Sequence, residues 1–137
     1  MLDPKVALQV QKGIRQAEDE LVTWIQEALE QTTYASGYNG LSDSQFRNLL
    51  RVADTTESSE VVKNFLRYQV GRDPRWGRGK GSLSERIIED IDGRLHAKAE
   101  SIAQVSKSTN LQEIWIDLIR RYLGYGTRYL KFKSVNQ

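Results

Sequence analysis

The chain has 137 residues with 20 Lys plus Arg and 18 Asp plus Glu, so its formal net charge is only +2. This length fits one domain, and 39% hydrophobic residues are enough for a core and too many for a disordered chain. With no cysteine and a single histidine, His96, the sequence excludes disulfide scaffolds, thiol nucleophiles and metal sites built from Cys or several His. No apolar run reaches the ~18 residues of a membrane span, and no signal peptide is recognisable, so we expect a cytoplasmic protein that contacts no membrane.

The small net charge hides an uneven distribution along the chain. Residues 1–40 carry three bases and six acids, whereas residues 61–84 carry six bases and one acid. Residues 118–137 carry five bases and no acid. Because local positive density matters more for polyanion binding than total charge does, the two basic segments favour a polyanionic partner.

Apolar residues recur at helical spacing through most of the first half of the chain. Asp3 followed by Pro4 is a typical helix start, and the periodicity predicts a helix over residues 4–31. The acids on its opposite side form either a solvated face or a surface for a basic partner. Ser42 and Gln45 form a capping box that opens a second helix, which we expect to end near residue 54. A third helix begins after Ser58 or Ser59 and ends near Gly71, a natural stop.

Two further helices are predicted in the second half. A capping box at Ser82 opens a helix over residues 83–102, in which Gly93 favours a kink or a close packing. Asn110 opens the last helix, whose apolar stripe continues to residue 130. No segment alternates with the period of a β-strand. The sequence therefore predicts an all-α fold, a bundle of about five helices.

Residues 72–82 contain alternating glycines and no helical pattern, so we expect a mobile basic loop inside a single helical domain of residues 1–137. The loop resembles a phosphate-binding loop only superficially, because Lys80 is followed by glycine and no strand precedes it. Nucleotide hydrolysis is therefore not expected. Trp76 lies between two arginines, where it either stacks on a nucleic-acid base or folds back onto the core.

Catalytic machinery is not predicted. His96 lies on the flank of the fourth predicted helix, where a lone histidine is an ordinary half-exposed surface residue. The acidic run over residues 89–92 could provide paired carboxylates, but Asp90 is four residues from an arginine on each side. That spacing is typical of a solvated helix face. We therefore expect no enzyme activity, no catalytic or metal-binding residue and no cofactor.

Cations off the apolar stripes are the main functional signal. Arginine and lysine directed at phosphates give sequence-independent, salt-sensitive affinity for nucleic acid. For any one residue a solvated or locally neutralised charge is the simpler interpretation, as Asp117 could neutralise Arg121, but the whole set favours polyanion binding. The predicted RNA-binding residues are Arg47, Arg51, Arg67, Arg72, Arg75, Arg78, Lys80, Arg121, Arg128 and Lys131.

Three segments resemble the small, all-helical subunit of type III CRISPR–Cas effector complexes, in particular that of the Csm branch. They are LSDSQFRNLL at residues 41–50, FLRYQVGR at residues 65–72 and YGTRYLKFK at residues 125–133. The first is similar to the family's capped helix start, the second to its mid-chain aromatic and arginine segment, and the third to its basic, aromatic C-terminal helix. With the length and helical class, the resemblance covers most of residues 41–133.

The resemblance implies a non-catalytic subunit that stacks in several copies along the backbone of the complex, while cleavage belongs to other subunits. Its implied partners are the guide RNA, the target RNA, the other subunits and further copies of itself. By position, Arg47 and Arg72 match basic residues of the family, and the remaining predicted RNA-binding residues come from the charge pattern alone. The acidic first helix would then face a neighbouring subunit.

Two other functions fit the same sequence. A protein–protein adaptor would bind a partner through the first helix, and its basic loops would only add solubility. A helical DNA-binding regulator would use the second and third predicted helices as a helix-turn-helix pair. The five-residue polar link between them and the lack of a recognition helix with base-reading side chains count against the regulator.

Overall fold

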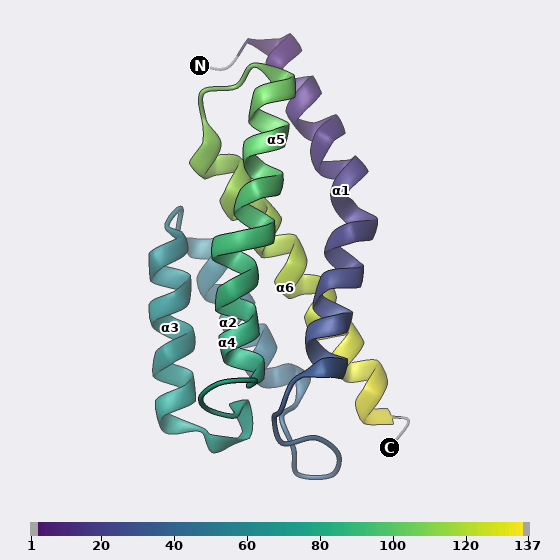
Figure 1. Cartoon of the computed structure of the whole chain (residues 1–137), viewed down its shortest axis with the longest axis vertical. Coiled ribbons are helices and arrows are strands. Elements are labelled where there is room, and N and C mark those ends of the chain that lie inside the picture. The colour runs from purple at the N-terminus through teal and green to yellow at the C-terminus, as the bar shows by residue number, and fades with distance from the viewer. Residues whose placement is uncertain (1–2, 136–137) are drawn as a thin grey trace.

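The computed structural model describes residues 3–135, and the regular structure of these residues is entirely helical. The elements in chain order are α1 (Pro4–Gln31), α2 (Asp43–Thr55), α3 (Ser59–Arg72), the 3₁₀ turn η1 (Pro74–Trp76), α4 (Leu83–Asp90), the π-helical segment η2 (Ile91–Leu95), α5 (His96–Ser106) and α6 (Leu111–Val135). Because α4, η2 and α5 follow one another without a break, the expected all-α bundle of five helices is confirmed (Figure 1).

The helices begin at the caps that the sequence indicates. Asp3, Ser58 and Ser82 each accept a backbone N–H from the first turn of their helix. Ser42 and Gln45 form both hydrogen bonds of the capping box. The fourth helix runs past the expected residue 102 to Ser106, where the next residue adopts a left-handed conformation with φ 63°. N-terminal caps depend on residues close in sequence, so the sequence predicts where the helices start. It does not predict the end of the fourth helix, because no glycine follows Ser106.

The last helix is the centre of the bundle. α6 packs against α1, α2 and α5, and it crosses behind α5 in Figure 1. α3 lies at the edge of the molecule, where it contacts α2, α4 and η1. Fully buried apolar side chains from every long helix meet in one core, among them Leu21, Leu49, Leu66, Ile87 and Ile119.

Three helices lie close together at Gly126. A Cβ at this position would lie 2.6 Å from Cε1 of Phe46 in α2 and 2.8 Å from Cγ1 of Ile25 in α1. Both neighbours are fully buried, so neither can move aside cheaply. Glycine therefore lets α6 pass this crossing without overpacking the core.

The fourth helix widens into a π turn over Ile91–Leu95. The backbone carbonyl of Ile91 accepts a hydrogen bond of 2.8 Å from Nε1 of Trp115, and such side-chain insertion is a common cause of helix irregularity. A Cβ on Gly93 would meet nothing within 4 Å. Of the two alternatives at Gly93, a kink or close packing, close packing is therefore wrong, and the irregularity of the helix here is the π turn.

A buried carboxylate lies at the start of this π turn. Only 3% of the surface of Asp90 is exposed, and its oxygens accept hydrogen bonds from the Tyr122 hydroxyl (2.6 Å) and from Nε of Arg94 (3.0 Å). Arg94 also pairs with Glu27 of α1 and lies over the Trp24 ring. Burial and the adjacent carboxylate raise the pKa of Tyr122 well above its usual value, so its hydroxyl stays a proton donor. The solvated-face interpretation of Asp90 is therefore wrong.

Replacing Gly126 with alanine tests the helix crossing. We expect Gly126→Ala to lower the free energy of unfolding by about 1–3 kcal/mol, because the added methyl overpacks the core against Phe46 and Ile25. Gly124→Ala is the matched control, since a Cβ there meets only Leu50, at an ordinary 3.9 Å. Urea denaturation followed by circular dichroism measures both variants, and equal stabilities would contradict the steric argument.

Candidate nucleic-acid interface

Five of the ten predicted RNA-binding residues gather at the C-terminal end of α3 and in the loop after it, at the lower left of Figure 1. We call this set the α3–loop cluster; it consists of Arg67, Arg72, Arg75, Arg78 and Lys80. The guanidinium of Arg78 donates hydrogen bonds to the backbone carbonyls of Val70 (3.1 Å) and Gly71 (3.0 Å), which draws the loop back onto the helix end. A cation is favourable there because the last carbonyls of a helix carry partial negative charge.

Members of the α3–loop cluster differ in whether their side chains already pair with other groups of the chain. Arg75 forms an ion pair of 2.8 Å with Asp73. Arg67 and Lys80 are exposed and have no side-chain partner within residues 3–135. Arg67 lines an open hollow between α3 and α4 whose walls also include Glu85, without an ion pair between the two. Arg72 is exposed, and its described hydrogen bond goes to the neutral hydroxyl of Tyr68 (3.3 Å). Three cations of the cluster are therefore available to a ligand.

The loop itself is more regular than its glycines suggest. Arg72 is the last residue of α3 and Pro74–Trp76 forms a 3₁₀ turn, so the expectation of a loop without regular structure is wrong over its first part. The backbone N–H of Thr33 donates to the carbonyl of Gly81 at the end of the loop (2.9 Å), and the carbonyl of Thr33 accepts from the N–H of Leu83 at the start of α4 (3.2 Å). These bonds join the loop to the segment after α1.

Trp76 anchors the loop to the core. Its side chain is fully buried, and its ring centroid lies 5.6 Å from that of Phe46. Its Nε1 has no hydrogen-bond partner in the described part of the chain, a cost that the apolar contacts of the ring offset. Of the two interpretations of Trp76, packing onto the core is correct, and the indole is not accessible for stacking on a base.

The remaining predicted RNA-binding residues lie on α2 and α6. Arg47 pairs with Asp43 one turn earlier, and Arg51 lies exposed on the same helix. Arg128 and Lys131 are exposed on the C-terminal part of α6, across the molecule from α3 in Figure 1. The ten residues therefore do not form one continuous patch.

Arg121 of α6 is held by two carboxylates. It pairs with Asp117 on its own helix and with Glu18 of α1, both at 2.9 Å. Its hydrogen bond with Asp117 raises the pKa of Arg121 further above its usual value. The neutralisation by Asp117 that the spacing allowed is confirmed, and Arg121 is the least suited of the ten to bind a phosphate.

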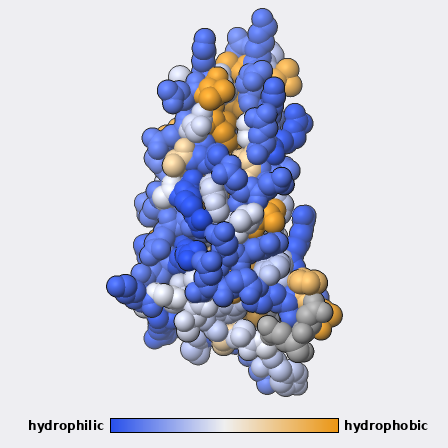
Figure 2. Space-filling model, turned by 45° about the vertical axis from the view of Figure 1, so that its right-hand side comes forward, coloured by the Kyte–Doolittle hydropathy of each residue, from blue (hydrophilic) through white to orange (hydrophobic). Residues whose placement is uncertain are grey.

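The acids of α1 find their basic partners inside the same chain. Four of them bridge to α6 or to the helical segment of η2 and α5: Glu18–Arg121 at 2.9 Å, Glu20–Lys98 at 2.7 Å, Glu27–Arg94 at 3.4 Å and Glu30–Lys133 at 3.2 Å. Figure 2, which brings the α1 side forward, shows a mainly hydrophilic face with small apolar patches. Much of the negative charge expected to meet another protein is thus neutralised within the bundle.

Lys63, four residues before Arg67 on α3, is a structural cation. Its surface is only 5% exposed, and its amine pairs with Asp92 of the π turn at 2.7 Å and with Glu60 at 3.0 Å. Burial alone would lower the pKa of Lys63, but the two carboxylates outweigh burial and raise it. Lys63 therefore holds α3 against the π turn.

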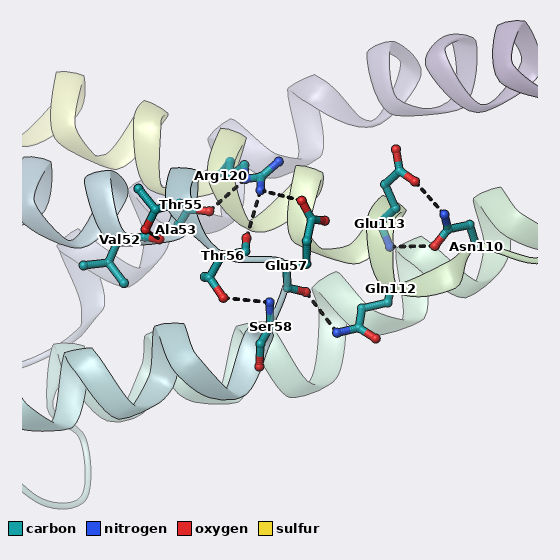
Figure 3. Close-up of polar contacts among 10 residues, drawn as sticks. All are labelled: Val52, Ala53, Thr55, Thr56, Glu57, Ser58, Asn110, Gln112, Glu113 and Arg120. Carbon is teal, nitrogen blue, oxygen red and sulfur yellow. Dashed lines mark hydrogen bonds and ion pairs between the residues drawn. The ribbon is translucent and has the colours of Figure 1, made fainter. Parts of the chain in front are cut away.

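Arg120 is a second structural cation, as the contacts in Figure 3 show. Its guanidinium donates to the carbonyls of Ala53 (2.8 Å) and Thr56 (2.9 Å), and Gln112 donates to the carbonyl of Glu57 (3.0 Å). These bonds fasten the link between α2 and α3 to α6.

The link between α2 and α3 has three residues, not the expected five, and the two helices run in opposite directions as a hairpin (Figure 1). This arrangement differs from the crossed pair of a helix-turn-helix motif.

Other kinds of site find little support in the described chain. Residues 3–135 hold no group of three or more His, Cys, Asp or Glu that could bind a metal ion. None of the helices in that range is long and apolar enough to cross a membrane. Comparison with protein-family models, curated proteins and solved structures found no match to this chain.

Asp73 gives the loop a pH-dependent anchor. It accepts hydrogen bonds from the side chain and the backbone N–H of Arg75, and these bonds lower its pKa from 3.8. Because the folded-state pKa is lowered, Asp73 adds stability above pH 3.8, and this stability is lost as the pH falls through the folded-state pKa.

We expect Asp73→Asn to lower the free energy of unfolding by about 0.5–1 kcal/mol at neutral pH, the range of a partly exposed ion pair. In acid, below the folded-state pKa, the difference from the unchanged protein should disappear. Urea titrations at neutral and acidic pH measure both values. An equal loss at both pH values would show that the charge of Asp73 does not matter.

Proposed function

We propose that this protein is a non-catalytic, RNA-contacting subunit of a type III CRISPR RNA-guided complex, and that the α3–loop cluster contacts phosphates. The observation that supports RNA binding is that Arg67, Arg72 and Lys80 are exposed at one end of the molecule and form no ion pair within residues 3–135. Cations left unpaired in the folded chain can neutralise phosphates and release counterions, which gives affinity without sequence preference. Such binding falls as salt is added.

The type III assignment is supported by the resemblance at residues 41–50, 65–72 and 125–133. The second of these segments ends at Arg72, so the family-like stretch and the α3–loop cluster share the last turns of α3. The proposed partners are guide RNA and target RNA, further copies of the chain and other subunits of a cytoplasmic complex. Arg128 and Lys131 would provide a second, separate phosphate contact.

A triple substitution in the cluster tests RNA binding. Arg67→Ala, Arg72→Ala and Lys80→Ala together should weaken binding of a short fluorescent RNA at least about tenfold at low salt. The slope of log affinity against log salt should fall by about 2, since each phosphate contact on a single strand contributes about 0.7. Fluorescence anisotropy at several salt concentrations measures both quantities.

Lys5→Ala, Lys12→Ala and Arg15→Ala form the matched control, because these three cations lie exposed on the first turns of α1, far from the loop in Figure 1. The control removes the same charge and should keep most of the affinity. Equal losses in both triple variants would contradict the site. Absence of RNA binding by the unchanged protein would contradict the function and favour the protein–protein adaptor.

A further inference from the structure

The exposed side of α3 carries an aromatic ring between a second ring and a guanidinium. We propose that Tyr68, supported by Phe65 and flanked by Arg72, stacks on an unpaired base of single-stranded RNA. This inference rests on the proposed RNA binding, and it concerns the contact with a base instead of the contacts with phosphates. We call the three residues the α3 stacking face.

Their spacing places the three residues on one face of α3. Phe65, Tyr68 and Arg72 are separated by three and four residues, the distances at which helix side chains become neighbours. The ring centroids of Phe65 and Tyr68 lie 6.0 Å apart with 41° between the planes. The guanidinium carbon of Arg72 lies 5.5 Å from the Tyr68 centroid, and its Nη1 donates to the Tyr68 hydroxyl at 3.3 Å.

This arrangement holds the phenol ring in place while leaving it open. Phe65 is half-buried against the core, so it forms a fixed support. Tyr68 nevertheless keeps 56% of its surface exposed. A ring whose position is already restricted loses little conformational entropy when a flat ligand covers it.

The surrounding charge indicates which flat ligand fits. The α3 stacking face adjoins the α3–loop cluster, because Arg72 belongs to both and Arg78 is bonded to the backbone at the end of the same helix. An aromatic ring beside a set of cations is the combination that binds single strands, where bases stack and phosphates meet positive charge. Duplex RNA hides the faces of its bases, so the ligand is a single-stranded stretch or a base turned out of a duplex.

Two spectroscopic readouts test the inference. The probe is a short single-stranded RNA that contains one 2-aminopurine, whose fluorescence is quenched when the base stacks on a ring. The unchanged protein should quench it, and Tyr68→Leu should abolish the quenching and weaken binding about tenfold. Tyr68→Phe should keep both, because the ring stays and only the hydroxyl is lost. Binding of a fully paired RNA should change little in either variant.

Tyr38→Leu is the control for the same change at another exposed tyrosine, since 96% of Tyr38 is exposed in the loop after α1. If Tyr68→Leu keeps the affinity and the quenching while the triple variant of the α3–loop cluster loses RNA, the stacking inference fails and the proposed function stands. An equal loss on single-stranded and paired RNA would show that Tyr68 only positions Arg72, which would also overturn it. If the unchanged protein binds neither RNA, both proposals fail.

Discussion

The bundle depends on one buried charge. Asp90 brings a carboxylate almost completely out of water, and such a group is tolerated only when its oxygens are hydrogen-bonded and a cation is near. Tyr122 and Arg94 meet both conditions, and Arg94 extends the contact to Glu27 of α1. Asp90 and Arg94 together thus link the fourth helix to α6 and to α1. Removing a partner would leave the carboxylate uncompensated, which is far more costly than losing an exposed ion pair.

The π turn that follows Asp90 connects this buried contact with α3 at the edge of the molecule. Trp115 of α6 fastens the turn through the Ile91 carbonyl, and Asp92 of the turn holds the amine of Lys63 in α3. α3 is therefore held on its inner side by the buried amine of Lys63 and the half-exposed carboxylate of Asp92, which leaves its outer side exposed. That outer side is where Arg67, Tyr68 and Arg72 are exposed.

The cations of the chain divide by whether the fold uses them. Lys63, Arg94, Arg120 and Arg121 join helices or fasten a link, and each of them has a carboxylate or carbonyl partner from another element. In the part of the chain that the structure describes, Arg67, Arg72 and Lys80 form no ion pair, and their side chains are exposed. Charge counted along the sequence cannot make this division. An uncompensated cation is recognised only when the positions of all nearby carboxylates are known.

The helices could be predicted from the sequence alone because they depend on local interactions. The caps at Asp3, Ser42 and Ser82 and the apolar spacing depend on residues three or four apart, so the all-α bundle and its helix starts could be predicted. Arg67, Arg72 and Lys80 could likewise be named from charge density, but only among ten candidate cations. Tertiary structure alone decided that Trp76 and Asp90 are buried and that the acids of α1 pair within the chain, because these contacts join residues far apart in sequence. It also decided that Tyr68 is open, since its exposure depends on α3 lying at the edge of the bundle.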